Sequence, residues 1–486
     1  MRNGGKDIQA ARIRALLFSQ FPYAPTNGQE ELIGRLADFL VNEDPDVLFM
    51  LKGYAGTGKT TVVSVLVKVL PLINRRSVLL APTGRAAKVL AGYSGQTAHT
   101  IHRMIYYART TQDGSLVLAL QENQHRHTYF IVDEASMIQN ESAAGEFSLF
   151  SQRNLLDDLF SYVSKGENCR LILVGDLAQL PPVGQVLSQA LDPGLLGKAF
   201  HKMVELFELT EVVRQSRDSG ILFNATHLRQ KITGNITTLP FFNLSGFSDI
   251  RSIHSMEMED LLQEAYAKYG QADTVVITRS NKRANIYNRE IRRRILFHEN
   301  DLAAGELLMV VRNNYFWLTH DSEAGFIANG DIIEILKIRN IQEMYGHRFA
   351  DVTVRMIDYP NQREFDVRLL LDTLFVEAAS LSVQEGAKLF QTIMEDYADL
   401  PRRRQRIEKV RNDPYYNALQ VKYAYALTCH KTQGGQWKWV FVDQGFVKDD
   451  SPDVEYMRWL YTALTRATEQ LYLVGFGEGY FERGKG

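Results

Sequence analysis

Short apolar runs that each end near a Gly, Asp or Thr constrain the fold of this chain more than any other feature. Amphipathic stretches such as TTVVSVLVKVLPLI and GRAAKVLAG separate most of these runs, which gives an alternation of strand and helix. Such an alternation is typical of open α/β sheets in which parallel strands are buried on both faces. We therefore expect functional residues at the carboxyl ends of the strands. The runs are VLFMLKG (47–53), SVLLAPT (77–83), YFIVDE (129–134), RLILVGD (170–176), TVVIT (274–278), WVFVD (439–443) and LYLVG (471–475).

The runs fall into two clusters, and this grouping predicts two α/β domains with a cleft between them. The first domain is predicted at residues 1–235 and the second at 236–331 and 418–486. Residues 332–417 begin with alternating apolar and polar positions, which predicts a small β-rich insertion. A shorter insertion, at 103–128, contains an Asp-Gly pair that is typical of a β-hairpin turn.

The composition limits how the chain could bind nucleic acid and in which cellular compartment it is expected. The 55 Lys and Arg residues nearly balance the 57 Asp and Glu residues, so any nucleic acid must be bound by a local groove. Cys169 and Cys429 are too few for a disulfide framework or a zinc site. The start of the chain does not resemble a leader peptide, and no run of about 18 apolar residues follows. A cytoplasmic protein without a membrane segment is expected.

A P-loop pattern follows the first apolar run. GYAGTGKT lies after a predicted strand and before a predicted helix, as this phosphate-binding motif requires. Lys59 would neutralise the β and γ oxygens of ATP, and the Thr60 hydroxyl would help to hold Mg²⁺. A chance match in a glycine-rich loop is the alternative. The predicted ATP-binding residues of this segment are Gly53, Tyr54, Ala55, Gly56, Thr57, Gly58, Lys59, Thr60 and Thr61.

Two carboxylates end the run YFIVDE. Asp133 is predicted to hold Mg²⁺, and Glu134 to orient and deprotonate the attacking water. Carboxylates at a strand end are often only solvated surface groups, and the P-loop is what favours the catalytic interpretation here.

Further strings identify a family. DEAS (133–136), GDLAQLPPVG (175–184), LTEVVRQ (209–215), CHKTQGGQW (429–437) and YTALTRA (461–467) occur in the order typical of superfamily 1 DNA helicases. The chain most resembles the RecD-like and Dda-like branch, from about residue 25 onward. This resemblance implies two RecA-like domains, an SH3-like insertion in the second, and 5′ to 3′ movement on single-stranded DNA. Single strands and duplex junctions are the implied partners, and a monomer is the implied active form.

The same resemblance assigns roles around the nucleotide. Gln29 is implied to grip adenine, although a surface amide is the ordinary alternative. Gln179 is implied to sense the γ-phosphate, with a loop-stabilising amide as its alternative. Arg214 and Arg466 are implied to be arginine fingers that reach the γ-phosphate from the two domains when the cleft closes.

A second group of residues is predicted to contact the DNA backbone. Thr83 lies where a strand end enters a helix, a place suited to a phosphate. The resemblance adds residues from TAHTIHRM and CHKTQGG, although ordinary packing is the alternative for the histidines. The predicted DNA-binding residues are Pro82, Thr83, Gly84, His99, His102, Thr428, His430, Lys431 and Gln433. Contacts of this kind imply no strong sequence specificity.

Aromatic and basic clusters leave alternatives open. Tyr106–Tyr107, Tyr315–Trp317 and the tryptophans at 437 and 439 could stack on bases or belong to the core. The basic segment 402–411 could contact DNA phosphates, or be a helix face paired with the preceding acids of MEDYADL.

Two departures from the resemblance bear on function. Relatives often carry Ser-Glu where this chain has Gly435 and Gln436, so a carboxylate that could hold a ribose hydroxyl is absent. The hairpin insertion is short, which leaves a translocase with weak unwinding as an alternative to a helicase. A P-loop kinase acting on a small molecule and a non-catalytic nucleic-acid-binding module are alternatives from other classes.

Overall fold

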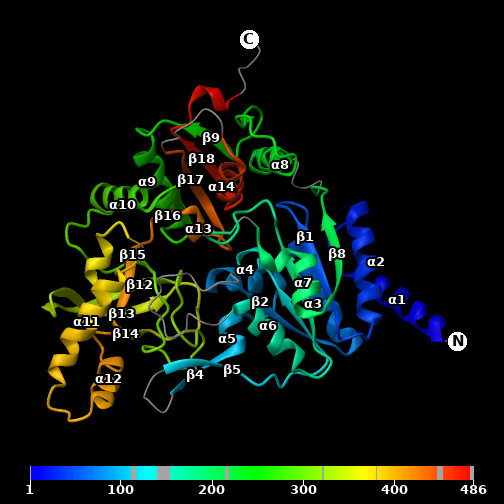
Figure 1. The fold of residues 1–486 in the computed structure, drawn as a ribbon. Coiled ribbons are helices and arrows are strands. Elements are labelled where there is room, and N and C mark those ends of the chain that lie inside the picture. Colours follow the sequence, from blue (N-terminus) through cyan, green and yellow to red (C-terminus); the bar gives the residue numbers. More distant parts are fainter. Residues whose placement is uncertain are drawn as a thin grey trace.

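The computed structural model of the chain contains two parallel sheets flanked by helices, and a small barrel beside the second sheet (Figure 1). It describes residues 2–110, 116–138, 154–185, 187–213, 218–319, 322–378, 380–445 and 452–481. The predicted α/β class with two parallel-sheet domains is confirmed. No helix in those ranges is both long enough and apolar enough to cross a membrane.

The first sheet has six strands in the order β3-β2-β6-β7-β1-β8, and every neighbouring pair is parallel. The side chains of β1 alternate between two apolar cores. Phe49 and Leu51 face the core beneath α1 to α4, whereas Leu48 and Met50 face the core beneath α5 to α7. Burial on both faces is what the near-continuous apolar runs predicted. The strands are β1 (Val47–Gly53), β2 (Arg76–Ala81), β3 (Ala98–Thr100), β6 (Thr128–Val132), β7 (Arg170–Gly175) and β8 (Met203–Leu209).

Helices cover both faces of this sheet. Most begin at side-chain caps that satisfy free backbone N–H groups, and Thr26 with Gln29 forms a reciprocal capping box at α2. The helices are α1 (Arg2–Ser19), α2 (Asn27–Val41), α3 (Lys59–Val69), α4 (Gly84–Ser94), α5 (Ile101–Ile105), α6 (Leu155–Ser164) and α7 (Pro193–Phe200).

The second sheet has five parallel strands in the order β16-β10-β17-β18-β9. Its strands are β9 (Ile250–Ile253), β10 (Thr274–Thr278), β16 (Ala426–Thr428), β17 (Trp437–Asp443) and β18 (Ala467–Val474). Its helices are α8 (Gly220–Thr233), α9 (Met258–Tyr269), α10 (Asn281–Glu290), α13 (Cys429–Thr432) and α14 (Val454–Leu464).

Helix α8 corrects the predicted boundary at residue 235. Ile221, Ala225 and Leu228 of this helix pack in the core of the second domain, and a Cβ on Gly220 would collide with Ile250 and Phe247. The second domain therefore begins before α8. A boundary drawn from the spacing of strands missed this because a helix can pack on either neighbour.

The β-rich insertion is a closed barrel of five strands, β11-β12-β13-β14-β15. Its strands are β11 (Leu307–Val310), β12 (Ile332–Met344), β13 (His347–Met356), β14 (Phe365–Leu370) and β15 (Leu419–Tyr423). The predicted limits of 332–417 were too narrow, because β11 pairs with both β12 and β15 and so closes the barrel. Helices α11 (Val383–Asp396) and α12 (Arg403–Arg411) lie between β14 and β15.

The hairpin insertion of the first domain is also present. Strands β4 (Tyr106–Thr110) and β5 (Leu116–Leu120) form an antiparallel pair of five residues each. The predicted Asp113-Gly114 turn lies outside the described residues. The hairpin projects from the edge of the first domain next to α5 (Figure 1).

Candidate nucleotide cleft and nucleic-acid interface

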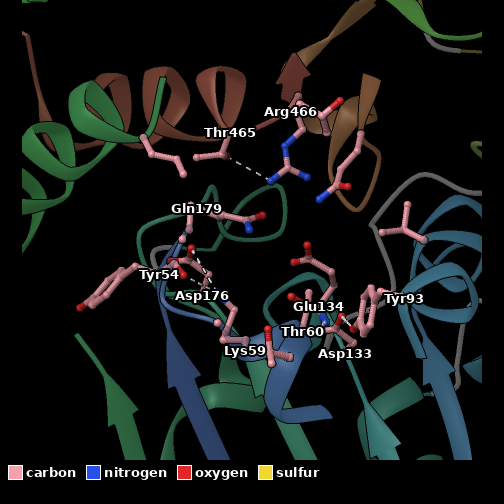
Figure 2. A pocket seen from close by; sticks show the side chains of 18 of the residues that line it. Tyr54, Lys59, Thr60, Tyr93, Asp133, Glu134, Asp176, Gln179, Thr465 and Arg466 are labelled. Atoms are coloured by element: carbon pink, nitrogen blue, oxygen red, sulfur yellow. Dashed lines mark hydrogen bonds and ion pairs between the residues drawn. The ribbon is translucent and has the colours of Figure 1, made fainter. Parts of the chain in front are cut away.

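A cleft of about 480 Å³ lies between the two parallel-sheet domains. Its floor comes from the P-loop and the ends of β6 and β7, and its roof from Gly434, Gln436 and residues 465–468 of the second domain. Figure 2 shows Lys59, Glu134 and Gln179 facing Arg466 across this space. The P-loop and the residues that follow β6 and β7 therefore meet at one edge of the first sheet, as parallel topology requires.

The P-loop conformation depends on its glycines. Gly56 and Gly58 have φ values of 74° and 85°, in the left-handed region that suits glycine. Gly58 is also the N-cap of α3, so the first N–H groups of this helix lie at the cleft. Lys59 Nζ donates to the carbonyls of Gly53 (2.7 Å) and Tyr54 (2.8 Å), which holds the ammonium at the mouth of the loop.

Asp133 and Glu134 follow β6 directly. Tyr93 of α4 donates its hydroxyl to Asp133 Oδ2 at 2.5 Å, and Glu134 takes the left-handed conformation with φ of 51°. A non-glycine residue in this region is strained, and such strain concentrates at functional sites. Glu134 Oε2 is buried with no hydrogen-bond partner among the described residues. Burial raises the pKa of this carboxyl, against the positive charges of Arg466 and Lys59.

Asp176, which lines the cleft, and Tyr461, which contacts it, had no role in the sequence analysis. Asp176, at the end of β7, is buried and lies 4.0 Å from Lys59 Nζ. Tyr461 of α14 donates its hydroxyl to Asp176 Oδ2 (2.7 Å) and accepts the N–H of Ala55 (2.8 Å). One phenol thus joins the P-loop to the second domain. Asp176 and Tyr461 lie inside GDLAQLPPVG and YTALTRA, so these strings were the available signal.

The predicted finger Arg466 lies at the roof of the cleft and is only 4 % exposed. Its guanidinium donates to the carbonyls of Thr462 (3.0 Å) and Gly435 (3.2 Å). Gln179 is nearly buried, and its Oε1 is unpartnered among the described residues. Arg214, the other predicted finger, lies outside the described residues.

Gln29 is placed differently from the expectation. Its Nε2 donates to the Thr57 carbonyl (3.1 Å) and its Oε1 accepts the N–H of Thr26 (3.1 Å). The side chain is fully buried under the P-loop, beside Gly58. In this conformation both ends of the amide support the loop. Contact with adenine therefore stays a prediction.

Two family models match the chain. One, described as an AAA domain, matches residues 26–239, and the other, a UvrD-like helicase C-terminal domain, matches residues 423–474. The matched ranges hold the two sides of the cleft.

Two related proteins and one solved structure are also similar to this chain. The ATP-dependent DNA helicase dda of Enterobacteria phage T4 is 24% identical over 469 residues, which cover 89% of this chain and 92% of that protein. The ATP-dependent RecD2 DNA helicase of Deinococcus radiodurans is 32% identical over 181 residues, covering 36% of this chain and 21% of that protein. A solved structure of Pif1 helicase from Bacteroides, in complex with ADP-AlF3 and ssDNA, aligns with 16% identity and a TM-score of 0.46 and covers 93% of each chain.

These matches support an ATP-dependent DNA helicase that is similar to superfamily 1 proteins. Both helicase relatives, RecD2 and dda, carry the names of the branch that the ordered strings resemble.

In this helicase three of the predicted DNA-binding residues, Pro82, Thr83 and Gly84, lie at the start of α4. Pro82 and Thr83 join β2 to α4, and the Thr83 hydroxyl caps α4 by accepting the N–H of Ala86 (3.2 Å). Gly84 follows at a crowded position, since a Cβ there would lie 2.4 Å from the Tyr359 hydroxyl and 2.8 Å from Asp331 Oδ1. The start of α4 is therefore covered by residues that flank or belong to the barrel.

The histidines of the helicase are less accessible than the DNA-binding prediction implied. The ring of His102 lies 6.3 Å from that of Phe326, and burial lowers the pKa of His102 to about 4. His99, on β3, and His430, on α13, are partly buried, and burial lowers the pKa of each. Neutral imidazoles would contribute hydrogen bonds and packing to a DNA contact and little charge.

Residues of CHKTQGG separate into two roles. Lys431 Nζ donates to Asn329 Oδ1 (2.6 Å), and Thr428 begins α13. Gln433 is buried and donates to the carbonyl of Leu180 (2.6 Å) in the first domain. Gln433 thus links the domains here, and a direct contact with DNA would require it to leave this bond.

The loop that departs from the family pattern has a steric reason for its glycine. A Cβ on Gly435 would lie 2.5 Å from the Trp437 ring and 2.8 Å from Arg85. Gln436 is exposed at the cleft. A larger residue at position 435 is therefore excluded by packing, independently of nucleotide selectivity.

The aromatic candidates of the helicase are divided between core and partly exposed positions. Trp437 and Trp439 are buried in the second domain, so they belong to the core. Tyr315 stacks on Phe326 at 4.9 Å, and Trp317 donates to the Asn417 carbonyl (2.8 Å). Stacking of these residues on bases stays a prediction.

Proposed function

We propose that the chain is an ATP-driven DNA helicase that moves 5′ to 3′ along single-stranded DNA and separates the strands of a duplex ahead of it. The observation that carries this proposal is the cleft itself. Lys59 and Glu134 come from one parallel-sheet domain and Arg466 from the other, so a complete site requires the two domains to approach each other. The cycle begins with ATP binding, and its result is a small relative shift of the domains.

The residues present fit ATP and Mg²⁺. The P-loop glycines leave N–H groups free at the start of α3, and Glu134 Oε2 is a buried acceptor without a partner among the described residues. Thr60 and Asp133 are the residues that would hold Mg²⁺, which would supply positive charge that stabilises the phosphates. Lys59 would exchange its carbonyl partners for phosphate oxygens. Glu134 would accept a proton from the attacking water, and its raised pKa suits a general base.

Contacts between the domains support coupling of the nucleotide to DNA. Leu180, next to Gln179, donates its N–H to the Thr462 hydroxyl (2.8 Å) and accepts from Gln433. A shift of Gln179 on a γ-phosphate would therefore move the CHKTQGG segment directly. Tyr461 adds a second link, from the P-loop to α14. These links give the domain motion a physical route.

The expected partners are single strands and duplex junctions bound by their backbones, and a monomer is the proposed active form. A small-molecule kinase needs no second parallel-sheet domain that carries an arginine into the cleft. A non-catalytic binding module would not need the strained Glu134, with its buried Oε2 atom, beside Lys59. The cytoplasmic location stays a prediction.

Steady-state ATP hydrolysis with and without single-stranded DNA tests the proposal, together with unwinding of duplexes that carry only a 5′ or only a 3′ tail. Strong stimulation and unwinding from the 5′ tail are expected. Unwinding from the 3′ tail would overturn the polarity. Stimulation without unwinding would favour the translocase, for which the shortness of the β4–β5 hairpin is the specific observation. Hydrolysis that ignores DNA would contradict the motor.

A further inference from the structure

The helical hairpin α11–α12 projects from the barrel at the end of the molecule farthest from α1 (Figure 1). A small separate core fixes it there. Leu389 and Ile393 of α11 and Val410 of α12 pack against Phe349 and Leu370 of the barrel. The base of the hairpin is therefore packed against the barrel, whereas residues 401–405 and 408–409 are exposed.

Helix α12 presents a cluster of exposed cations. Arg402, Arg403, Arg404 and Lys409 are exposed, and we name these four residues the α12 basic cluster. The first turn of α12 contains no acidic residue, and Arg402 provides no side-chain cap. Positive charge in the first turn opposes the helix dipole. The local sequence therefore weakens its own helix, which is a pattern expected where function overrides stability.

The acids near α12 do not neutralise the cluster. Asp396 of α11 accepts a hydrogen bond from Tyr345, and Asp413 accepts one from Tyr397 (2.9 Å). Within the described parts of the chain, no ion pair joins the α12 basic cluster to a carboxylate. The four residues of the α12 basic cluster are therefore not paired with the acids of MEDYADL among the described residues, whereas such pairing elsewhere in the segment 402–411 stays a prediction. The cluster concentrates positive charge at one place on a chain whose net charge is only -2.

We propose that the α12 basic cluster binds the phosphates of duplex DNA ahead of the point of strand separation. This proposal rests on the helicase function proposed above and adds a second DNA surface to it. Duplex DNA carries about one negative charge per 1.7 Å of its axis. It can therefore contact several closely spaced cations at once, which a small anion cannot do. Side chains of this kind contact phosphates without reading bases, so the binding is independent of sequence.

The place of the cluster separates it from the predicted single-strand contacts. Gly84, His102 and Lys431 all meet the segment 324–331 or its neighbour Tyr359, on the side of the barrel that faces the first domain. Helix α12 lies beyond the barrel from that side, and in Figure 1 it shares the lower edge of the view with the β4–β5 hairpin. A duplex that reaches the hairpin would therefore lie on the same edge of the molecule as α12 in this view.

The test compares two triple variants with equal loss of charge. The first is Arg402→Gln with Arg403→Gln and Arg404→Gln. The matched control, Lys6→Gln with Arg12→Gln and Arg14→Gln, removes three exposed cations from α1 at the opposite end of the molecule. Fluorescence anisotropy would measure binding to a blunt duplex, a 5′-tailed duplex and a single strand at several salt concentrations. Thermal unfolding would confirm that both variants fold.

We expect the α12 variant alone to bind duplex DNA more weakly. The slope of log K against log salt on duplex DNA should become shallower by about 0.9 for each phosphate that the variant no longer neutralises, hence by about 2 to 3 for the three arginines together. Single-strand binding and the stimulation of ATP hydrolysis by single strands should match the unmodified protein. An unchanged duplex slope would overturn the proposal, and so would an equal weakening in the α1 control or on single strands. Failure of the helicase function itself would appear separately, as hydrolysis in the unmodified protein that ignores DNA.

Discussion

Replacement of Arg466 by alanine should abolish turnover while the nucleotide still binds. The guanidinium lies at the roof of the cleft, 4 % exposed, and its position depends on the Thr462 and Gly435 carbonyls. The phosphate-binding P-loop belongs to the other domain. Loss of Arg466 therefore removes charge stabilisation of the transition state and leaves the P-loop intact.

Two magnitudes separate catalysis from stability. An arginine finger contributes about 10³ to 10⁵ in rate, equivalent to about 4 to 7 kcal/mol of barrier. Alanine would also leave the Gly435 carbonyl without this donor, at about 1 to 3 kcal/mol if it stays buried and unpaired, whereas the Thr462 carbonyl keeps the Thr465 hydroxyl at 3.0 Å. The second cost affects unfolding and the first affects only turnover, so the two are measured independently.

The assay is DNA-stimulated ATP hydrolysis, with binding of a fluorescent ATP analogue and thermal unfolding measured in parallel. Arg466→Lys keeps the charge but cannot span the same carbonyls, and it should also lose most of the activity. Arg279→Ala is the matched control, because Arg279 is an exposed arginine of the same domain that packs over Tyr456. Wild-type-like hydrolysis by Arg466→Ala would refute the assignment. Loss of nucleotide binding together with early unfolding would show that Arg466 acts only by supporting its loop.

Three further predictions follow from individual carboxylates. Glu134→Gln should lower turnover by about 10² to 10⁴ with nucleotide binding retained, and rapid hydrolysis in a single-turnover assay would contradict its role as base. Burial raises the pKa of Asp331 from 3.8 to about 8. Between these two pH values the carboxyl is protonated in the folded chain but ionised in the unfolded chain, so the free energy of unfolding falls as the pH rises from 3.8 to about 8. Asp331→Asn should flatten this fall in thermal unfolding between pH 4 and pH 8, and an unchanged slope would contradict the burial argument. Arg85 and Lys88 lie 3.4 Å and 3.5 Å from Asp358 Oδ1, so Asp358→Asn should release both cations. The slope of log K against log salt for single-strand binding should then steepen by about 0.7 per released cation. Unchanged binding would show that neither cation reaches DNA.

The strand-and-helix alternation was predictable because burial on both faces of a parallel sheet demands continuous apolar runs. Each of the seven runs appears as a strand, and the P-loop lies between β1 and α3 as its motif requires. Lys59 and Glu134 could be assigned from sequence because parallel strands bring their carboxyl ends to the same edge. Local chemistry and sheet topology agreed at these positions.

The domain boundaries and the hydrogen-bond partners of buried side chains could not be predicted in the same way. Helix α8 packs on the second domain, and β11 and β15 close a barrel across more than 100 residues of sequence. The packing partner of α8 and the pairing of β11 with β15 leave no trace in the local pattern of apolar residues, because an apolar face can pack against any apolar neighbour. The amides were ambiguous for a similar reason, because Gln29 and Gln433 each find a buried backbone carbonyl that only the folded chain supplies.

The sequence by itself determined that this chain has two P-loop-type sheets, a phosphate site and the ordered strings of a superfamily 1 helicase, because these depend on short-range patterns. Tertiary structure alone decided that Tyr461 links the P-loop to Asp176, and that the four residues of the α12 basic cluster form no ion pair with a carboxylate among the described residues. Both depend on which distant side chains come within hydrogen-bonding distance. Chain spacing carries no information about that distance until the domains have packed.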